Sequence, residues 1–163
     1  MQSVAYSRHR ARIGDRKRSG FTLIELMITV AIVSLLAVVA TGQYLAYVER
    51  AKVDRAKSDI LMIALAVERF RSHDFTYPPD LATLGLAGKL DPWGRPYHYT
   101  ELSGPGSKGK ARKDHKLNPL NSDFDLFSAG KDGIFKTQID QKFSRDDVIR
   151  ARDGAFVDLA EKF

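Results

Sequence analysis

The most demanding chemical group in this sequence is the carboxylate of Glu25, the only charged side chain between Phe21 and Ala40. A carboxylate among apolar residues is unfavourable by roughly 3 kcal/mol at the centre of a bilayer and by less near its edge, so it needs a partner. The residues allow two partners: the polar headgroups, reached if the side chain extends toward the interface, and the amine of Phe21 if that residue begins the chain.

The segment that positions Glu25 is an uninterrupted apolar run over residues 21–40. About 20 helical residues, rising about 1.5 Å each, span roughly 30 Å, which is the thickness of the hydrocarbon core of a bilayer. Residues 1–20 carry six Arg and Lys side chains against the single acid Asp15, and basic flanks stay in the cytoplasm. We therefore expect a single membrane-spanning helix with a cytoplasmic amino terminus.

Residues 17–25 form a motif that reads Lys-Arg-Ser-Gly-Phe-Thr-Leu-Ile-Glu. It resembles the processing site of type IV pilins and type II secretion pseudopilins. The resemblance implies that residues 1–20 are a basic leader, that a prepilin peptidase cleaves between Gly20 and Phe21, and that the new amino-terminal Phe21 is methylated. It also implies that Glu25 pairs with the free amine of Phe21 of a neighbouring subunit as a filament grows.

The pattern after the apolar run predicts one long helix from about Phe21 to about Ser72. Gly42 weakens a helix by about 1 kcal/mol without breaking it. Apolar residues then recur at alternating spacings of three and four, which is typical of a helix face that packs on a core; they are Val53, Ala56, Ile60, Ile63, Val67 and Phe70. The helix must end before Tyr77-Pro78. Asp80 is expected to cap a short helix that ends near Leu86.

Two further segments predict the strands of a small sheet. Asp91-Pro92-Trp93-Gly94 initiates a turn before Tyr97 and Tyr99, which fall on one face of a strand, and Trp93 is expected to anchor the core. This segment and the strand-like residues 124–128 resemble the major pseudopilin of type II secretion. The predicted fold class is α+β and pilin-like: the long amino-terminal helix packs on an antiparallel sheet of about three strands, with a short helix after Asp146. The expected domains are a transmembrane, filament-core helix over 21–42 and a periplasmic globular domain over 43–163.

The same resemblance implies a loop that binds calcium. Residues 124–133 resemble the segment that opens a calcium loop in the major pseudopilin. The matching positions are the carbonyls of Ala129 and Ile134 and the side chains of Asp132, Ser144, Asp146 and Asp147. All are oxygen donors, which a hard cation requires. The chain departs from the family in the 14 residues from Asp132 to Asp146, a longer loop, and in the 16 residues beyond Asp147.

An alternative role exists for part of this set. Ser144-Arg145-Asp146-Asp147 also fits a helix capping box with an acidic first turn. The two interpretations are compatible, and the residues alone do not decide between them.

Composition limits the other functions. Of the net charge of +6, five charges lie in residues 1–20, so basicity does not indicate a nucleic-acid partner. The Gly-rich basic stretch 103–117 has no interleaved aromatics and is interpreted as a solvated hairpin loop. There is no Cys, which rules out a disulfide. No Ser-His-Asp set, His-rich metal cluster or phosphate loop supports an enzyme.

The predicted function is therefore that of a structural subunit of a type II secretion pseudopilus in the bacterial inner membrane. By resemblance, its partners are other copies of itself, the prepilin peptidase, the minor pseudopilins and the inner-membrane assembly platform, and the periplasmic filament drives protein export. A type IV or competence pilus subunit is the alternative, against which the missing disulfide and the Asp-Pro-Trp-Gly motif argue. An anchored enzyme or sensor would need neither Gly20-Phe21 nor Glu25.

Overall fold

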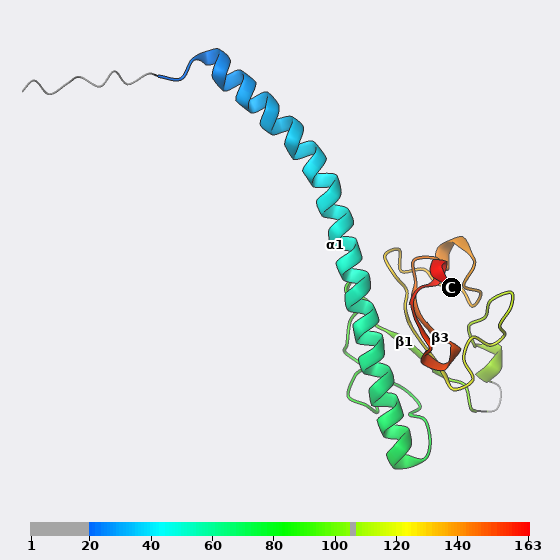
Figure 1. Ribbon diagram of the computed structural model, residues 1–163. Helices are drawn as coiled ribbons and strands as arrows, with labels where there is room; N and C mark the ends of the chain where they lie inside the picture. Colours follow the sequence, from blue (N-terminus) through cyan, green and yellow to red (C-terminus); the bar gives the residue numbers. More distant parts are fainter. Residues whose placement is uncertain (1–19, 105–106) are drawn as a thin grey trace, which may run out of the picture. The chain divides into compact units, whose positions relative to one another are not determined.

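The long helix α1, Leu23–Asp74, dominates the computed structural model, which describes residues 20–104 and 107–163 (Figure 1). It passes through Gly42 without interruption, as expected for one glycine in a helix. Its ends lie within two residues of the predicted ones. The chain divides into two compact units, Met1–Gly42 and Gln43–Phe163, so α1 contains residues of both.

In the first unit, the side chains of α1 from Leu23 to Gly42 are exposed to solvent in the single chain. This part of α1 is long and apolar enough to cross a membrane, judged by length and composition. A helix that is apolar on all sides needs an apolar environment, either lipid or other helices.

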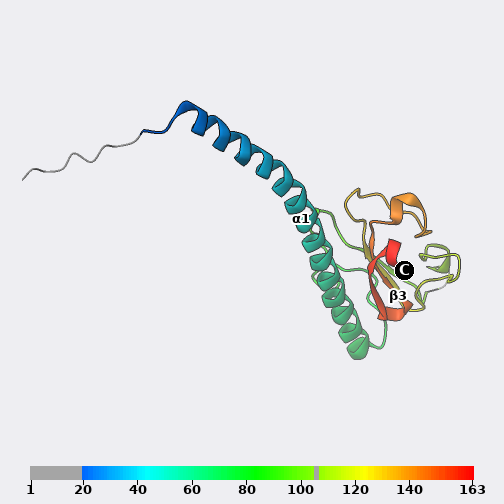
Figure 2. The same ribbon diagram turned by 45° about the horizontal axis from the view of Figure 1, so that its top comes forward.

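In the second unit, four antiparallel strands form one sheet in the order β1-β2-β3-β4. Figure 2 shows β3 beside the part of α1 that belongs to this unit. The strands are β1 His98–Glu101, β2 Phe124–Ser128, β3 Val148–Ala151 and β4 Phe156–Leu159. Tyr99 is paired with Leu126, and Phe127 with Ile149. The α+β, pilin-like fold class is confirmed, with four strands where about three were predicted.

The core lies between α1 and one face of the sheet. The predicted stripe of α1 is buried at Ala56, Ile60, Ile63 and Val67, and it packs with Phe124, Leu126, Val148, Tyr97 and Leu81. Each large aliphatic side chain buried in this way stabilises the fold by about 2 kcal/mol. Because successive residues of a strand point to opposite faces, Phe127 of β2 belongs to a second cluster on the other face, with Leu120, Ile139 and Ile149.

The carboxyl-terminal segment corrects one prediction. Residues 146–163 contain no α-helix; they form β3, β4 and two short 3-10 turns, η3 Arg152–Gly154 and η4 Ala160–Lys162. The capping-box interpretation of Ser144 is therefore wrong, because strand β3 follows it at Val148 and the preceding 3-10 turn, η2 Lys142–Ser144, has no side-chain cap. Pairing of Val148 and Ile149 with β2 outweighs the local capping pattern.

The segments beside the sheet are mostly turns. The helix predicted from Asp80 to Leu86 is a series of turns, although Asp80 Oδ1 does accept a hydrogen bond from the Thr83 amide at 2.9 Å. Trp93 is half-buried against the helix-side core, as predicted, and its indole N–H donates to Glu49 at 3.3 Å. Ser107–Gly109 forms a further 3-10 turn, η1.

Candidate functional site

Glu25 has a partner in its own chain. Its Oε2 accepts hydrogen bonds from the Thr22 amide at 3.0 Å and from the Thr22 hydroxyl at 2.9 Å, while its own amide donates to Thr22 Oγ1 at 3.2 Å. Since α1 begins at Leu23, this is a capping box with Thr22 as N-cap and Glu25 at the third helical position. Thr22 was not among the partners predicted for Glu25. The spacing Thr-x-x-Glu, which is typical of a capping box, could have identified Thr22 as a partner.

The predicted processing junction lies directly ahead of this cap. Gly20 and Phe21 are exposed and precede the first helical residue, and the Phe21 side chain is 79% exposed. A Cβ added to Gly20 would meet no atom within 4 Å. The rest of the predicted leader, residues 1–19, lies outside the described residues. Cleavage, methylation and the pairing of Glu25 with a neighbouring amine stay predictions.

The first part of the predicted calcium loop is closed by hydrogen bonds of its own. The carbonyl of Ala129 accepts from the Gly133 amide at 3.1 Å, and Asp132 Oδ1 accepts from the Ile134 amide at 2.7 Å. The amide of Asp132 donates to Asp146 Oδ2 at 3.0 Å. The structure thus brings Asp132 and Asp146 together, with each carboxylate accepting a backbone N–H.

The other two predicted ligands have different partners. The hydroxyl of Ser144 is buried and accepts from the Lys136 amide at 2.8 Å. The carboxylate of Asp147 is buried and accepts from Arg112 Nη2 at 2.5 Å. Across residues 20–104 and 107–163, no group of three or more His, Cys, Asp or Glu side chains is arranged to hold a metal ion. The calcium site stays a prediction.

Arg112 is one of several buried polar residues that the sequence did not identify. It lies in the stretch interpreted as a solvated loop, yet it is only 3% exposed, its amide donates to Asp125 Oδ2 at 2.6 Å, and its guanidinium lies 4.1 Å above the Phe127 ring. Burial raises the pKa of Asp147 to about 6, against the lowering effect of Arg112. Arg112 Nε and Nη1 and Asp147 Oδ1 make no hydrogen bond within the described residues.

Arg95, which lies before strand β1 in the chain, also contacts the predicted calcium loop. Its Nη1 donates to the carbonyl of Gly130 at 2.5 Å, and its Nη2 donates to that of Lys131 at 3.1 Å. Gly133 has a φ of +74°, and a Cβ at this position would overlap the Arg95 guanidinium. A glycine is therefore required here both for the backbone conformation and for the close approach of Arg95.

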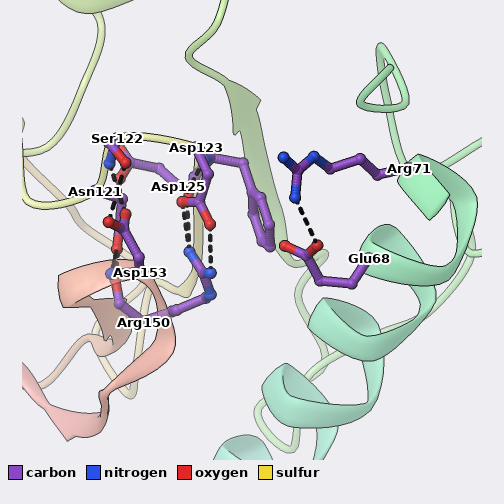
Figure 3. Close-up of polar contacts among 9 residues, drawn as sticks. Glu68, Arg71, Asn121, Ser122, Asp123, Asp125, Arg150 and Asp153 are labelled. Carbon is purple, nitrogen blue, oxygen red and sulfur yellow. Dashed lines mark hydrogen bonds and ion pairs between the residues drawn. The ribbon is translucent and has the colours of Figure 1, made fainter. Parts of the chain in front are cut away.

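A second buried arginine organises the far end of the sheet (Figure 3). Arg150 of β3 holds Asp123 through two hydrogen bonds, Nη1 to Oδ1 at 2.8 Å and Nη2 to Oδ2 at 2.6 Å, and its guanidinium lies 3.9 Å above the Phe124 ring. Burial raises the pKa of Asp123, but the hydrogen bonds from Arg150 and from the Phe124 amide lower it by a larger amount, so the net pKa is below its ordinary value. Bidentate, charge-assisted pairs of this kind fix geometry strongly.

Asn121 extends this network to the β3–β4 turn (Figure 3). Its Nδ2 donates to Asp125 Oδ1 and to the Arg150 carbonyl, both at 2.9 Å. Its Oδ1 accepts from the Asp153 amide at 2.9 Å, and Asp153 Oδ1 accepts from the Ser122 amide at 2.7 Å. Asp153 has a φ of +54°, a conformation that these bonds stabilise. The network holds strands and turns together, and its donors and acceptors are paired with one another.

Comparisons with known proteins agree with the amino-terminal motif. The family model described as the prokaryotic N-terminal methylation motif matches residues 15–41. The type II secretion system core protein G of Pseudomonas aeruginosa PAO1 is 35% identical over 139 residues, which cover 72% of this chain and 87% of the relative. The core protein G of Escherichia coli K12 is 29% identical over 79% of this chain and 92% of its own. A fimbrial protein of Pseudomonas aeruginosa is 47% identical, over 32% of this chain and 34% of its own. No solved structure matches significantly.

A methylation motif that opens a helix long and apolar enough to span a membrane, followed by a helix-on-sheet unit, defines the class of pilin-like filament subunits. Within this class, the match to core protein G extends through the globular unit, whereas the fimbrial match covers a third of the chain. The chain belongs to the family of type II secretion system core protein G, and it is a pseudopilin subunit.

Proposed function

We propose that the chain is made as a prepilin, cleaved after Gly20 by a prepilin peptidase and methylated at Phe21. The match to the methylation motif over residues 15–41 supports this proposal. So does the exposure of Gly20 and Phe21 ahead of α1, because a peptidase must bind its substrate in extended form. The basic residues before Gly20 keep the amino terminus in the cytoplasm, and residues 43–163 lie in the periplasm.

The mature subunits polymerise with one another into a periplasmic filament that drives protein export. Minor pseudopilins and an inner-membrane assembly platform are the other partners, and the subunit acts as a structural element rather than as an enzyme. The exposed apolar part of α1 supports polymerisation, since helices of neighbouring subunits can replace lipid around it.

Glu25 exchanges partners during this assembly. In the single chain its carboxylate caps α1 through Thr22. In the filament it pairs with the Phe21 amine of a neighbouring subunit, because two opposite charges in an apolar interior stabilise each other more than either is stabilised by a hydroxyl. The Phe21 amine becomes available only after cleavage, so processing precedes assembly.

The processing junction carries this proposal, and mass spectrometry of assembled subunits tests it. The mature chain is expected to begin at Phe21 and to carry one additional methyl group. Gly20→Leu should block cleavage, whereas Gly42→Leu, at a glycine whose Cβ would also meet no atom within 4 Å, should be processed normally. Assembled filaments that still contain Met1 would refute the proposal.

A further inference from the structure

The loop in which calcium is predicted, residues 129–147, already contains positive charge supplied by the chain. Arg112 contributes its guanidinium to the carboxylate of Asp147, and Arg95 contributes its guanidinium to the carbonyls of Gly130 and Lys131. These are the kinds of oxygen atom, carboxylate and backbone carbonyl, that a calcium ion would bind. Of these acceptors, the Asp147 carboxylate belongs to the predicted ligand set, and the carbonyls of Gly130 and Lys131 follow the predicted ligand Ala129 directly in the chain.

Arg112 is fixed in this position. Its side chain is buried between the Phe127 ring and Asp147, and its amide is held by Asp125. A divalent cation bound to Asp147 would lie beside this guanidinium in a site of low polarity, where like charges repel strongly. Without Asp147, the predicted set retains two carboxylates, those of Asp132 and Asp146, which are the only charged ligands left in it.

Arg95 is fixed as well. Its amide donates to Asp91 Oδ1 at 2.8 Å, and Asp91 Oδ2 accepts from the Ser128 hydroxyl at 2.5 Å. The Ser128 hydroxyl accepts from the Gly130 amide at 3.2 Å, which connects the network to the loop. The missing side chain at Gly133 provides the space for the guanidinium.

Residues 137–139 of the loop provide a third anchor. The Lys113 amide donates to the Thr137 carbonyl at 2.9 Å, and the Ile139 amide donates to the Lys113 carbonyl at 3.0 Å. The side chain of Ile139 is buried in the second core cluster. Residues 137–139 are thus attached to the segment that carries Arg112, and their attachment uses backbone hydrogen bonds and apolar packing.

We propose that Arg95 and Arg112 replace a bound metal ion in this chain, so that the loop of residues 129–147 folds and keeps its conformation without calcium. The Asp147 carboxylate pairs with Arg112, and the Asp132 and Asp146 carboxylates accept backbone N–H donors. The Arg95 guanidinium holds the carbonyls of Gly130 and Lys131. This arrangement belongs to the individual subunit and does not depend on filament assembly.

The first test uses the full chain in detergent micelles, with the fluorescence of Trp93, its only tryptophan, as the measure of unfolding. We expect the melting temperatures in about 1 mM calcium chloride and in excess EGTA to agree within about 1 °C. A loop that requires calcium would instead raise the melting temperature by about 5 °C or more on calcium addition. Such a rise in the unmutated chain would overturn the proposal.

The second test removes the internal cation. Arg112→Met should lower the melting temperature in EGTA by about 10 °C, because it leaves Asp147 buried without a counter-charge. Lys110→Met is the matched control: it removes a cation two residues away whose side chain is exposed, and it should change the melting temperature by less than about 2 °C. Equal effects of the two substitutions would refute the role of Arg112. If Arg112→Met fails to fold, the calcium comparison in the unmutated chain still decides the question.

Discussion

The contribution of the Arg150–Asp123 pair can be predicted from its burial. Arg150 is 5% exposed and the Asp123 side chain 12%, so replacing Arg150 by Met leaves a carboxylate with little water and without its two strongest donors. Breaking a buried ion pair on one side costs about 3–5 kcal/mol. Since Met keeps part of the packing on the Phe124 ring, we expect the free energy of unfolding to fall by about 3 kcal/mol, the lower end of that range.

The matched control for this substitution is Arg71→Met (Figure 3). Arg71 also contacts a carboxylate, that of Glu68 at 3.5 Å, but the two side chains are 53% and 40% exposed. Solvent screens such a pair, and its removal should change the free energy of unfolding by less than about 1 kcal/mol. The two variants therefore differ mainly in burial of the pair.

The assay is urea unfolding of the full chain in detergent micelles, followed by Trp93 fluorescence. Urea is chosen because guanidinium chloride would screen the ion pairs being compared. For Arg150→Met the midpoint should fall clearly and the slope should stay constant, as expected when stability changes and the unfolding reaction does not. The double variant Arg150→Met with Asp123→Leu should recover part of the loss, because the unpaired charge is gone. Equal midpoints for Arg150→Met and Arg71→Met would refute the assignment of stability to the buried pair.

Two further predictions concern other carboxylates. Glu25→Gln keeps an acceptor for the Thr22 cap but has no charge, so it should preserve amide-exchange protection in the first turn of α1 and still fail to form filaments. Glu25→Ala should lose both the protection and the filaments, with a capping loss of about 1 kcal/mol. Filaments of Glu25→Gln at normal length would contradict the pairing with the Phe21 amine. Burial raises the pKa of Asp59, but hydrogen bonds from Lys89 and Tyr97 lower it by a larger amount, so its net pKa is below the ordinary value. The stability that Asp59 contributes is thus present above about pH 4 and is lost as the pH falls through its folded-state pKa. The free energy of unfolding of Asp59→Asn should therefore fall less steeply in acid than that of the unmutated chain. Parallel plots of this free energy against pH would disprove the prediction.

The sequence by itself determined the parts of this protein that depend on local pattern. The apolar run after Phe21, the basic residues before it and the spacing of Ala56, Ile60, Ile63 and Val67 were sufficient to predict one long helix with an exposed apolar half and a packed half. Periodicity identifies such segments because the same few residues both form the element and bury its face. The Thr22–Glu25 cap belongs to this local kind of information as well, since its partners are three residues apart.

Only the tertiary structure decided which charged side chains of the second unit are buried and which residues they pair with. Arg112 and Asp147 are 35 residues apart in the sequence, and Arg150 and Asp123 are 27 apart, so nothing near any of them distinguishes a buried arginine from a solvated one. The carboxyl-terminal strands also depend on contacts between distant residues, because the pairing of Val148 and Ile149 with β2 outweighs the local capping pattern at Ser144. A buried charge is tolerated only where a distant partner compensates its desolvation, and that partner is brought into place by the fold as a whole.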